Sequence, residues 1–195
     1  PEDMPVQIDR IEQILDALRI PILRVDGFEA DDIIGTLACR AAADDIDVRI
    51  CSKDKDLLQL IDGHVCTLDL KTGKLTDRDT MQRDMGITPE QVVDCLALEG
   101  DTSDNVPGVP LIGPKTAREL IRTYGTLDNL YAHLDEIKGK RGENLRTFQD
   151  QAYLSQKLVT LDCQVPLDVE YKTLELESPD RDKLSKLFTE LGFSR

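Results

Sequence analysis

The sequence has no tryptophan, and aromatic residues make up only 4% of its 195 residues. It has two histidines and five cysteines without a C-x-x-C pair, so a zinc site or a disulfide framework is a poor explanation. The cysteines indicate reduced, mostly buried thiols in a cytosolic protein. No apolar run exceeds a few residues, so we expect no membrane-spanning segment. With 24 Lys and Arg against 38 Asp and Glu, the chain is not a uniformly basic nucleic-acid binder.

The first half of the chain alternates between strand-like and helix-like segments. The 40% of hydrophobic residues recur regularly, which favours a folded chain with a buried core over disorder. Apolar spacing predicts helices over 5–19, 29–43 and 54–61, and strands over 22–25, 48–51 and 64–70, with a hairpin turn at 71–74. This order predicts an α/β fold with a mostly parallel sheet flanked by helices.

The second half reads as helical. Thr88, Pro89 and Gln91 form a helix-start signature, and Gly125 supplies a helix stop. We expect helices over 88–98, 114–124, 126–134, 141–161 and 179–191, the last starting at Ser178-Pro179, with a Gly/Pro loop over 99–113. The expected divisions are an α/β core over 1–104, a helical subdomain over 105–162, and a C-terminal extension over 163–195 whose helix packs on the core.

The net charge of -14 is unevenly distributed. Residues 26–56 hold nine acidic and four basic residues, and residues 84–104 hold six acidic and no basic ones. These two segments carry -11 of the total, and the only net positive stretch, 105–150, follows the second of them directly. The acidic charge is therefore concentrated beside a basic segment, which points to local sites more than to a general repulsion of anions.

Three short acidic motifs lie at predicted strand ends or at the mouth of the Gly/Pro loop. Strand ends are where open α/β sheets place their sites. Close carboxylates repel one another by about 1 kcal/mol or more per pair near a surface, which divalent cations would offset. Oxygen ligands select hard ions such as Mg²⁺ or Mn²⁺, and two such ions can clamp the attacking and leaving oxygens of a phosphoryl displacement. The candidate ligands are Glu29, Asp31, Asp32, Asp54, Asp56, Asp101 and Asp104. Taken singly, the first motif is more often helix capping, the second more often a solvated helix start, and the third is equally typical of a turn.

The run from Val106 to Thr116 leads straight into a helix. Gly108 and Gly113 allow close backbone approach to a ligand, and the free N–H groups of the helix start make an anion site. Lys115, Arg118 and Arg122 recur about one helical turn apart. The segment is therefore either a tight interhelical loop with a solvated basic face, or a helix–hairpin–helix that grips phosphates without reading bases.

Taken together, three long motifs resemble the 5'-nuclease (flap endonuclease) superfamily, and most closely the 5'→3' exonuclease domain of bacterial DNA polymerase I. They are 27–38, 52–60 and 98–109, and the segments 142–146 and 165–168 also fit. The resemblance covers essentially the whole chain. It implies a PIN-like core with a helix–hairpin–helix subdomain, and a metal-dependent phosphodiesterase that acts on 5' ends and flaps of branched DNA in replication and repair.

The resemblance also assigns residues. Glu29, Asp31, Asp32 and Asp54 would serve a first Mg²⁺ or Mn²⁺ ion, and Asp56, Asp101 and Asp104 a second. The hairpin would contact DNA through Gly108, Ile112, Gly113, Lys115, Thr116 and Arg118, and would hold a K⁺ ion. The implied partners are DNA with 5' flaps or ends and the remaining polymerase domains of the same parent chain, in the cytoplasm of a bacterium and associated with its nucleoid.

Two departures from the family pattern stand out. Family members begin with a strand that carries a metal-binding Asp, followed by a basic helical arch, and this sequence starts after both. We therefore expect weak or no nuclease activity from the isolated chain. Leu111 stands where the family hairpin usually has glycine. Two alternatives stay open: a non-catalytic module that binds DNA through the hairpin, and a related nuclease that acts on RNA ends.

Overall fold

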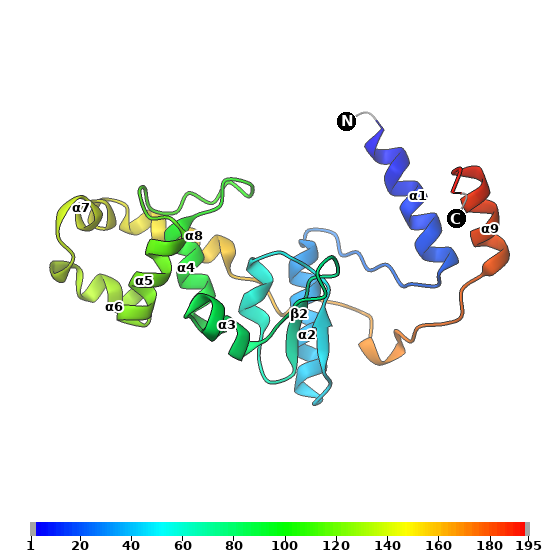
Figure 1. Cartoon of the computed structure of the whole chain (residues 1–195), viewed down its shortest axis with the longest axis horizontal. Helices are drawn as coiled ribbons and strands as arrows, with labels where there is room; N and C mark the ends of the chain where they lie inside the picture. Colours follow the sequence, from blue (N-terminus) through cyan, green and yellow to red (C-terminus); the bar gives the residue numbers. More distant parts are fainter. Residues whose placement is uncertain (1–2, 194–195) are drawn as a thin grey trace.

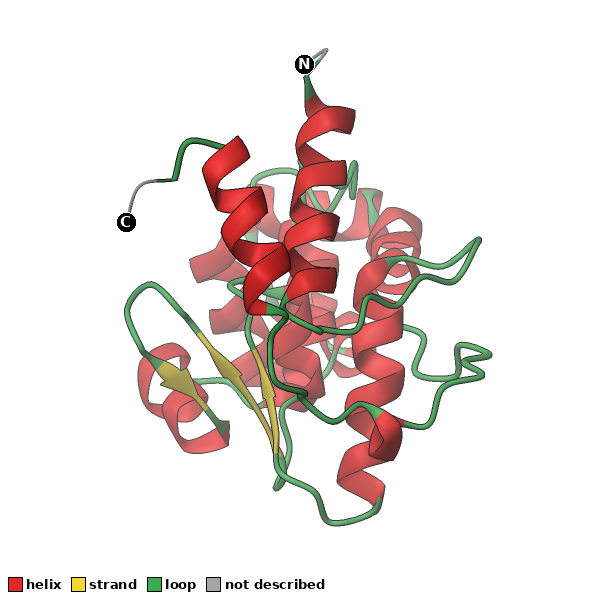
Figure 2. Cartoon of the chain, turned by 90° about the vertical axis from the view of Figure 1, so that its right-hand side faces the viewer, coloured by secondary structure: helices red, strands yellow, loops and turns green. Residues whose placement is uncertain are grey.

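The computed structural model describes residues 3–193, so the outermost residues of the first and last predicted divisions, 1–2 and 194–195, lie outside the described residues. Its sheet has three short strands in the order β1 (Val48–Ile50), β2 (Val65–Leu68) and β3 (Leu75–Thr76). β1 runs parallel to β2, with Val48 opposite Val65, and β2 runs antiparallel to β3, with Thr67 opposite Thr76 (Figure 2). The strands and the hairpin turn predicted after residue 48 are confirmed.

The strand predicted over 22–25 is wrong. Residues 20–25 are largely exposed and form no ladder with any strand of the described chain. A strand needs a neighbour for its backbone hydrogen bonds, and the apolar run Ile22-Leu23 has none here. This segment instead links α1 (Met4–Ala17) to α2 (Ala30–Ala43) as an extended connection.

The α/β part is built around α2, which lies against β1 (Figure 1). The helix begins at Glu29 in extended backbone and buries Ile33, Ala38 and Ala41. The segment predicted as helical over 54–61 is a 3-10 helix, η1 (Asp56–Leu60), and Leu57 from it joins the small core beneath the sheet. α3 (Arg78–Met85), which has no counterpart among the predicted helices, starts at Asp77, whose side chain accepts a hydrogen bond from the Thr80 amide.

The helical part contains the larger core. It comprises η2 (Pro89–Gln91), α4 (Val92–Glu99), α5 (Pro114–Tyr124), α6 (Leu127–Ala132), η3 (Leu134–Glu136), α7 (Gly139–Thr147) and α8 (Gln149–Val159). α4 is the central helix, and it packs on both α8 and α5. The helix predicted over 141–161 is two helices, because the backbone leaves helical geometry at Phe148.

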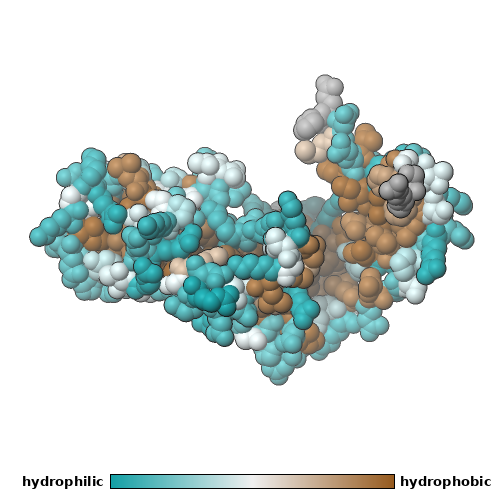
Figure 3. Space-filling view, viewed as in Figure 1, coloured by the Kyte–Doolittle hydropathy of each residue, from teal (hydrophilic) through white to brown (hydrophobic). Residues whose placement is uncertain are grey.

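The C-terminal segment runs through η4 (Tyr171–Thr173) to α9 (Arg181–Glu190), which packs against α1. This pair of helices stands apart from the sheet in Figure 1, and the Asp180 amide ties it together by donating to the Ala17 carbonyl at 2.8 Å. α9 starts at Asp180, not at the predicted Ser178-Pro179, because the Asp180 side chain caps the Lys183 amide. Figure 3 shows apolar side chains gathered around this pair. None of the described helices combines the length and apolar composition that a bilayer crossing requires.

Candidate functional site

The predicted acidic residues come from three separate segments of the chain, one of which is the start of α2. We call Glu29, Asp31, Asp32, Asp54, Asp56, Asp101 and Asp104 the acidic edge. Glu29 caps α2 and Asp31 and Asp32 lie in its first turn. Asp54 lies between β1 and η1, and Asp56 is the first residue of η1. Asp101 and Asp104 lie in the loop that follows α4. The α2 motif does serve as a cap, since Asp32 Oδ2 accepts from the Glu29 amide at 3.3 Å as part of a capping box. Asp32 Oδ1 also accepts from the Asp162 amide at 2.9 Å.

Electrostatic effects show that the three motifs are near one another. Burial raises the pKa of Asp31, and the charges of Asp54, Glu29, Asp32 and Asp104 raise it further. These carboxylates come from all three motifs, although they are far apart in the sequence. Each of the three motifs thus contributes a charge that acts on Asp31, while the assignment of the seven residues to one metal site stays a prediction.

Asp56 has the most strongly perturbed carboxylate of the acidic edge. Burial, with the charge of Asp54 next, raises its pKa from the ordinary 3.8 to about 6. Its Oδ1 atom is buried and has no hydrogen-bond partner in the structure. A buried oxygen without a donor costs about 1–3 kcal/mol, and more when it is charged. This oxygen fits a bound cation, which would replace the missing donor.

Lys55 is the cation that faces this edge. Its Nζ lies 2.9 Å from Asp101 Oδ2 and 3.1 Å from Glu99 Oε1. Burial alone would lower the pKa of Lys55, but hydrogen bonds to these two carboxylates outweigh it and the pKa is raised. The same contact, with the Ser103 amide donating to Asp101 Oδ1 at 2.7 Å, lowers the pKa of Asp101. Glu99 lies inside the motif over 98–109, but the sequence prediction gives neither it nor Lys55 a role.

The carboxylates are neighbours but do not form a closed chelating group. Within residues 3–193, no three His, Cys, Asp or Glu side chains converge closely enough to hold a metal ion together. The contacts given above show part of the reason. Asp32 is engaged by two backbone amides, and Asp101 by Lys55 and the Ser103 amide. The assignment of individual ligands stays a prediction.

The Gly/Pro loop that follows α4 is held shut at its base. The backbones of Asp101 and Val106 exchange two hydrogen bonds of 2.9 and 2.7 Å. Gly100 and Gly108 lie against each other so closely that a Cβ on Gly108 would be 2.5 Å from the Gly100 nitrogen. The loop therefore carries Asp101 and Asp104 on a fixed base.

The predicted DNA-contacting residues of the loop divide into inward and outward groups. Gly108 is buried, its N–H donates to Ser155 Oγ at 3.0 Å, and its carbonyl accepts from Gln151 Nε2 at 2.6 Å. Ile112 is buried in the helical core. These two residues are thus engaged within the protein and shape the loop from inside.

The outward group lies at the start of α5. Gly113 is exposed and precedes the helix in extended backbone, with no atom near its open face. Lys115 is exposed and Thr116 half-buried in the first turn. A cavity of about 440 Å³ along the helix is lined by Met85, Pro114, Lys115, Arg118, Glu119 and Arg122. The predicted basic stripe is therefore a real surface feature.

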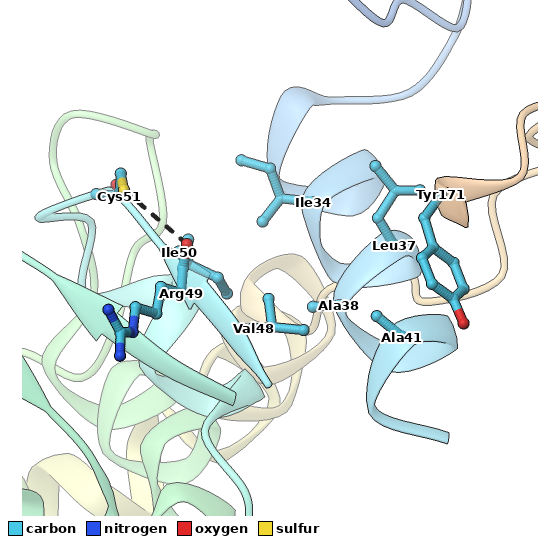
Figure 4. A pocket seen from close by; sticks show the side chains of 10 residues that line it. Ile34, Leu37, Ala38, Ala41, Val48, Arg49, Ile50, Cys51 and Tyr171 are labelled. Atoms are coloured by element: carbon cyan, nitrogen blue, oxygen red, sulfur yellow. Dashed lines mark hydrogen bonds between the residues drawn. The ribbon is translucent and has the colours of Figure 1, made fainter. Parts of the chain in front are cut away.

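A second cavity, of about 360 Å³, lies between α2 and β1 (Figure 4). Ile34, Leu37 and Ala41 line it from α2, and Val48 and Ile50 from β1, with Tyr171 at the far side. Its lining includes no carboxylate, so it is distinct from the acidic edge.

Comparison with known proteins adds two family models. Residues 1–93 match the N-terminal resolvase-like domain of 5'-3' exonucleases, and residues 87–182 match the C-terminal SAM fold of the same enzymes. DNA polymerase I of Bacillus caldotenax is 42% identical over 99% of this chain and 23% of its own length. DNA polymerase I of Pseudomonas aeruginosa is 43% identical over 99% of this chain and 22% of its own. The chain thus spans less than a quarter of these relatives.

Solved structures show the same fold. A phage T5 5'-exonuclease with divalent zinc bound superposes with a TM-score of 0.69, at 22% identity, over 98% of this chain and 70% of that one. The catalytic core of Rad2 in complex with a DNA substrate superposes with a TM-score of 0.66, at 17% identity, over 98% of this chain and 66% of that one.

Proposed function

This chain belongs to the 5'-3' exonuclease family, and from that membership we propose that it hydrolyses DNA phosphodiester bonds at 5' ends and flaps with the help of divalent cations. The observation that carries the proposal is the loop over 100–113, which starts at the acidic edge and ends at the basic start of α5. One short segment thus joins a place for cations to a place for phosphates. The T5 5'-exonuclease structure contains divalent zinc ions, and the Rad2 catalytic core is in complex with a DNA substrate.

The acidic edge is the part of the chain that would hold the cations. Asp56 Oδ1, buried and without a donor, is the group most in need of one, and oxygen-only ligands favour Mg²⁺ or Mn²⁺ over softer ions. Glu29, Asp31, Asp32 and Asp54 would serve one ion, and Asp56, Asp101 and Asp104 the other. Bound there, the ions supply charge stabilisation to the attacking and leaving oxygens of phosphoryl displacement.

The chain's own residues would orient the substrate. The free amides at the start of α5, together with Lys115 and Thr116, would hold a backbone phosphate, and Arg118 would extend the contact along the cavity. Gly113 would let the phosphate approach the backbone closely, and its carbonyl neighbours would be the place for a K⁺ ion. The rest of a longer polymerase I chain would be the other partner.

The test is cleavage of a 5'-flap DNA by the 195-residue chain with Mg²⁺ or Mn²⁺, with the protein in excess over DNA so that the weak activity expected from the sequence is detected. Activity that is lost in Asp56→Asn, with DNA binding retained, supports the proposal. A matched RNA flap separates the deoxyribonuclease from a nuclease of RNA ends, since only the DNA flap is expected to be cut. Activity that survives Asp56→Asn and Asp101→Asn together contradicts the assignment.

A second function has its own support. The carboxylates of the described residues form no closed chelating group, and a cation of the protein already occupies Asp101. Both observations favour a DNA-binding module without catalysis. This candidate predicts duplex binding that depends on Lys115 and Arg118 but not on divalent metal, with no cleavage of any flap.

A further inference from the structure

Lys55 lies in a more sheltered ion pair than the other lysines of its region. Among the salt bridges of residues 3–193, it is the only cation that pairs with a carboxylate of the acidic edge. Its partners Asp101 and Glu99 have side chains only 16% and 10% exposed. Lys53, two positions earlier, pairs with Asp69 at 3.3 Å and is 60% exposed. Shielded pairs are screened less by solvent, so the contact of Lys55 has more electrostatic effect.

Lys55 would compete with any divalent cation that binds Asp101. Lys55 takes Asp101 Oδ2, and the Ser103 amide takes Oδ1. A divalent cation bound by Asp101 would lie close to the ammonium and repel it. We propose that Lys55 is a resident counter-ion of the acidic edge, which holds Asp101 while no divalent cation is bound and shifts onto Glu99 when one arrives. This proposal rests on the proposed function, because it assumes that the edge binds metal.

Glu99 is what makes the exchange possible. It is the last residue of α4, just outside the acidic edge, and its nearly buried carboxylate needs a cation in either state. An ammonium that leaves Asp101 therefore has a partner within reach and does not have to enter water. With two carboxylates and one ammonium, the group of three carries a net charge of -1.

The charge balance predicts that removing the charge of Lys55 and removing the charge of Glu99 change the affinity for a divalent cation in opposite directions. Removing the ammonium leaves two unpaired carboxylates, which attract a cation more strongly. Removing the charge of Glu99 leaves Lys55 and Asp101 as a neutral pair, which attracts a cation less strongly and binds Lys55 to Asp101 alone. A merely structural salt bridge predicts the same loss of stability from both changes and no change in metal affinity.

The experiment measures Mn²⁺ binding to the 195-residue chain by calorimetry. We expect Lys55→Met to lower the Kd about tenfold and Glu99→Gln to raise it by a similar factor. Lys55→Arg keeps the charge and is expected to stay within about twofold of the wild type. Lys53→Met is the matched control, because it removes an equal charge whose partner is outside the edge, and its Kd should be unchanged.

A metal-free measurement accompanies the titration. Urea unfolding of Lys55→Met, Glu99→Gln and the double variant should show coupling, with the double change less costly than the two single changes added. Equal Kd values for wild type and Lys55→Met, or weaker binding by Lys55→Met, overturn the counter-ion role. Additive unfolding effects overturn it too. If the wild type binds no Mn²⁺, the metal site of the proposed function falls as well, whereas the other outcomes leave that site standing.

Discussion

Replacing Gly108 by alanine is the sharpest test of how the loop over 100–113 is built. Gly108 has a φ of 61°, which is left-handed backbone, and an added Cβ would lie 2.5 Å from the Gly100 nitrogen and 2.7 Å from its Cα. These neighbours are backbone atoms, so no side-chain rotation relieves the contact. The substitution must push the two strands of the loop base apart.

The expected cost follows from these contacts. Left-handed backbone costs an alanine about 1–2 kcal/mol relative to glycine. Separation of the loop also breaks the buried hydrogen bonds of Gly108 to Ser155 and Gln151, each worth about 1–3 kcal/mol if its partner is left unsatisfied. The free energy of unfolding should fall by roughly 3–8 kcal/mol, a large part of the ~5–15 kcal/mol typical of a domain.

Gly113→Ala is the matched control. Gly113 has a φ of -94°, and an added Cβ meets no atom within 4 Å, so its stability should stay within about 0.5 kcal/mol of the wild type. Urea unfolding followed by circular dichroism measures both variants, and fluorescence anisotropy with a labelled duplex measures DNA binding by the folded one. Gly113→Ala is expected to fold and bind DNA more weakly. A Gly108→Ala variant within about 1 kcal/mol of the wild type would refute the role given to the loop base.

Three further changes test other parts of the structure. Asp94 is buried, and its two carboxylate oxygens accept hydrogen bonds from the Leu127 amide at 2.9 Å and from Gln156 at 2.6 Å. Asp94→Asn keeps only one of these oxygens, so the free energy of unfolding in urea should fall by about 1–3 kcal/mol. An unchanged urea midpoint would contradict this. The pKa of Asp56 rises from 3.8 to about 6 on folding, so the folded state binds this proton more tightly than the unfolded state does. The free energy of unfolding of the metal-free protein, measured in urea, should therefore fall as the pH rises from about 4 to about 6. Asp56→Asn should flatten this pH dependence, and a profile identical to that of the wild type would count against it. Leu111 has a φ of 68°, which is left-handed backbone that glycine adopts more easily, and its side chain is 76% exposed. Leu111→Gly should therefore raise the free energy of unfolding, measured by thermal denaturation, by about 0.5–1 kcal/mol. A decrease would show that the leucine side chain makes a stabilising contact.

The sequence predicted those parts of the fold that depend on local periodicity. The helices over 29–43 and 114–124 match α2 and α5 closely, because each has a strong apolar face and a clear start signal. The segment at 22–25 failed for a reason that no local pattern contains. Its apolar residues suit a strand, but a strand also requires a partner strand for its backbone hydrogen bonds, and residues 3–193 provide none there.

For the candidate site, the sequence indicated which acidic residues to consider but not the contacts that they make. Acidic residues at strand ends and helix starts indicated the edge, since topology brings such positions together. Glu99 could not be anticipated, because its importance comes from a tertiary contact with Lys55 across 44 positions of sequence. Gly108 shows the reverse case: glycine correctly signalled a close approach, but the group approached is Gly100 of the same chain and not an external phosphate.

The contact between Gly100 and Gly108 also helps to fix the distance between the acidic edge and the start of α5. Asp101 sits at one end of the loop and Gly113 at the other, and between them the chain is fastened to α4 by the Val109 amide, which donates to the Leu98 carbonyl at 2.8 Å. The base of the loop is also anchored to α8 through Ser155. Both anchoring helices are packed in the larger core. The spacing between the carboxylates and the start of α5 is therefore set by rigid helices. A change at the loop base should disturb divalent-cation and phosphate binding together, whereas a change at Gly113 should weaken phosphate binding and leave divalent-cation binding unchanged.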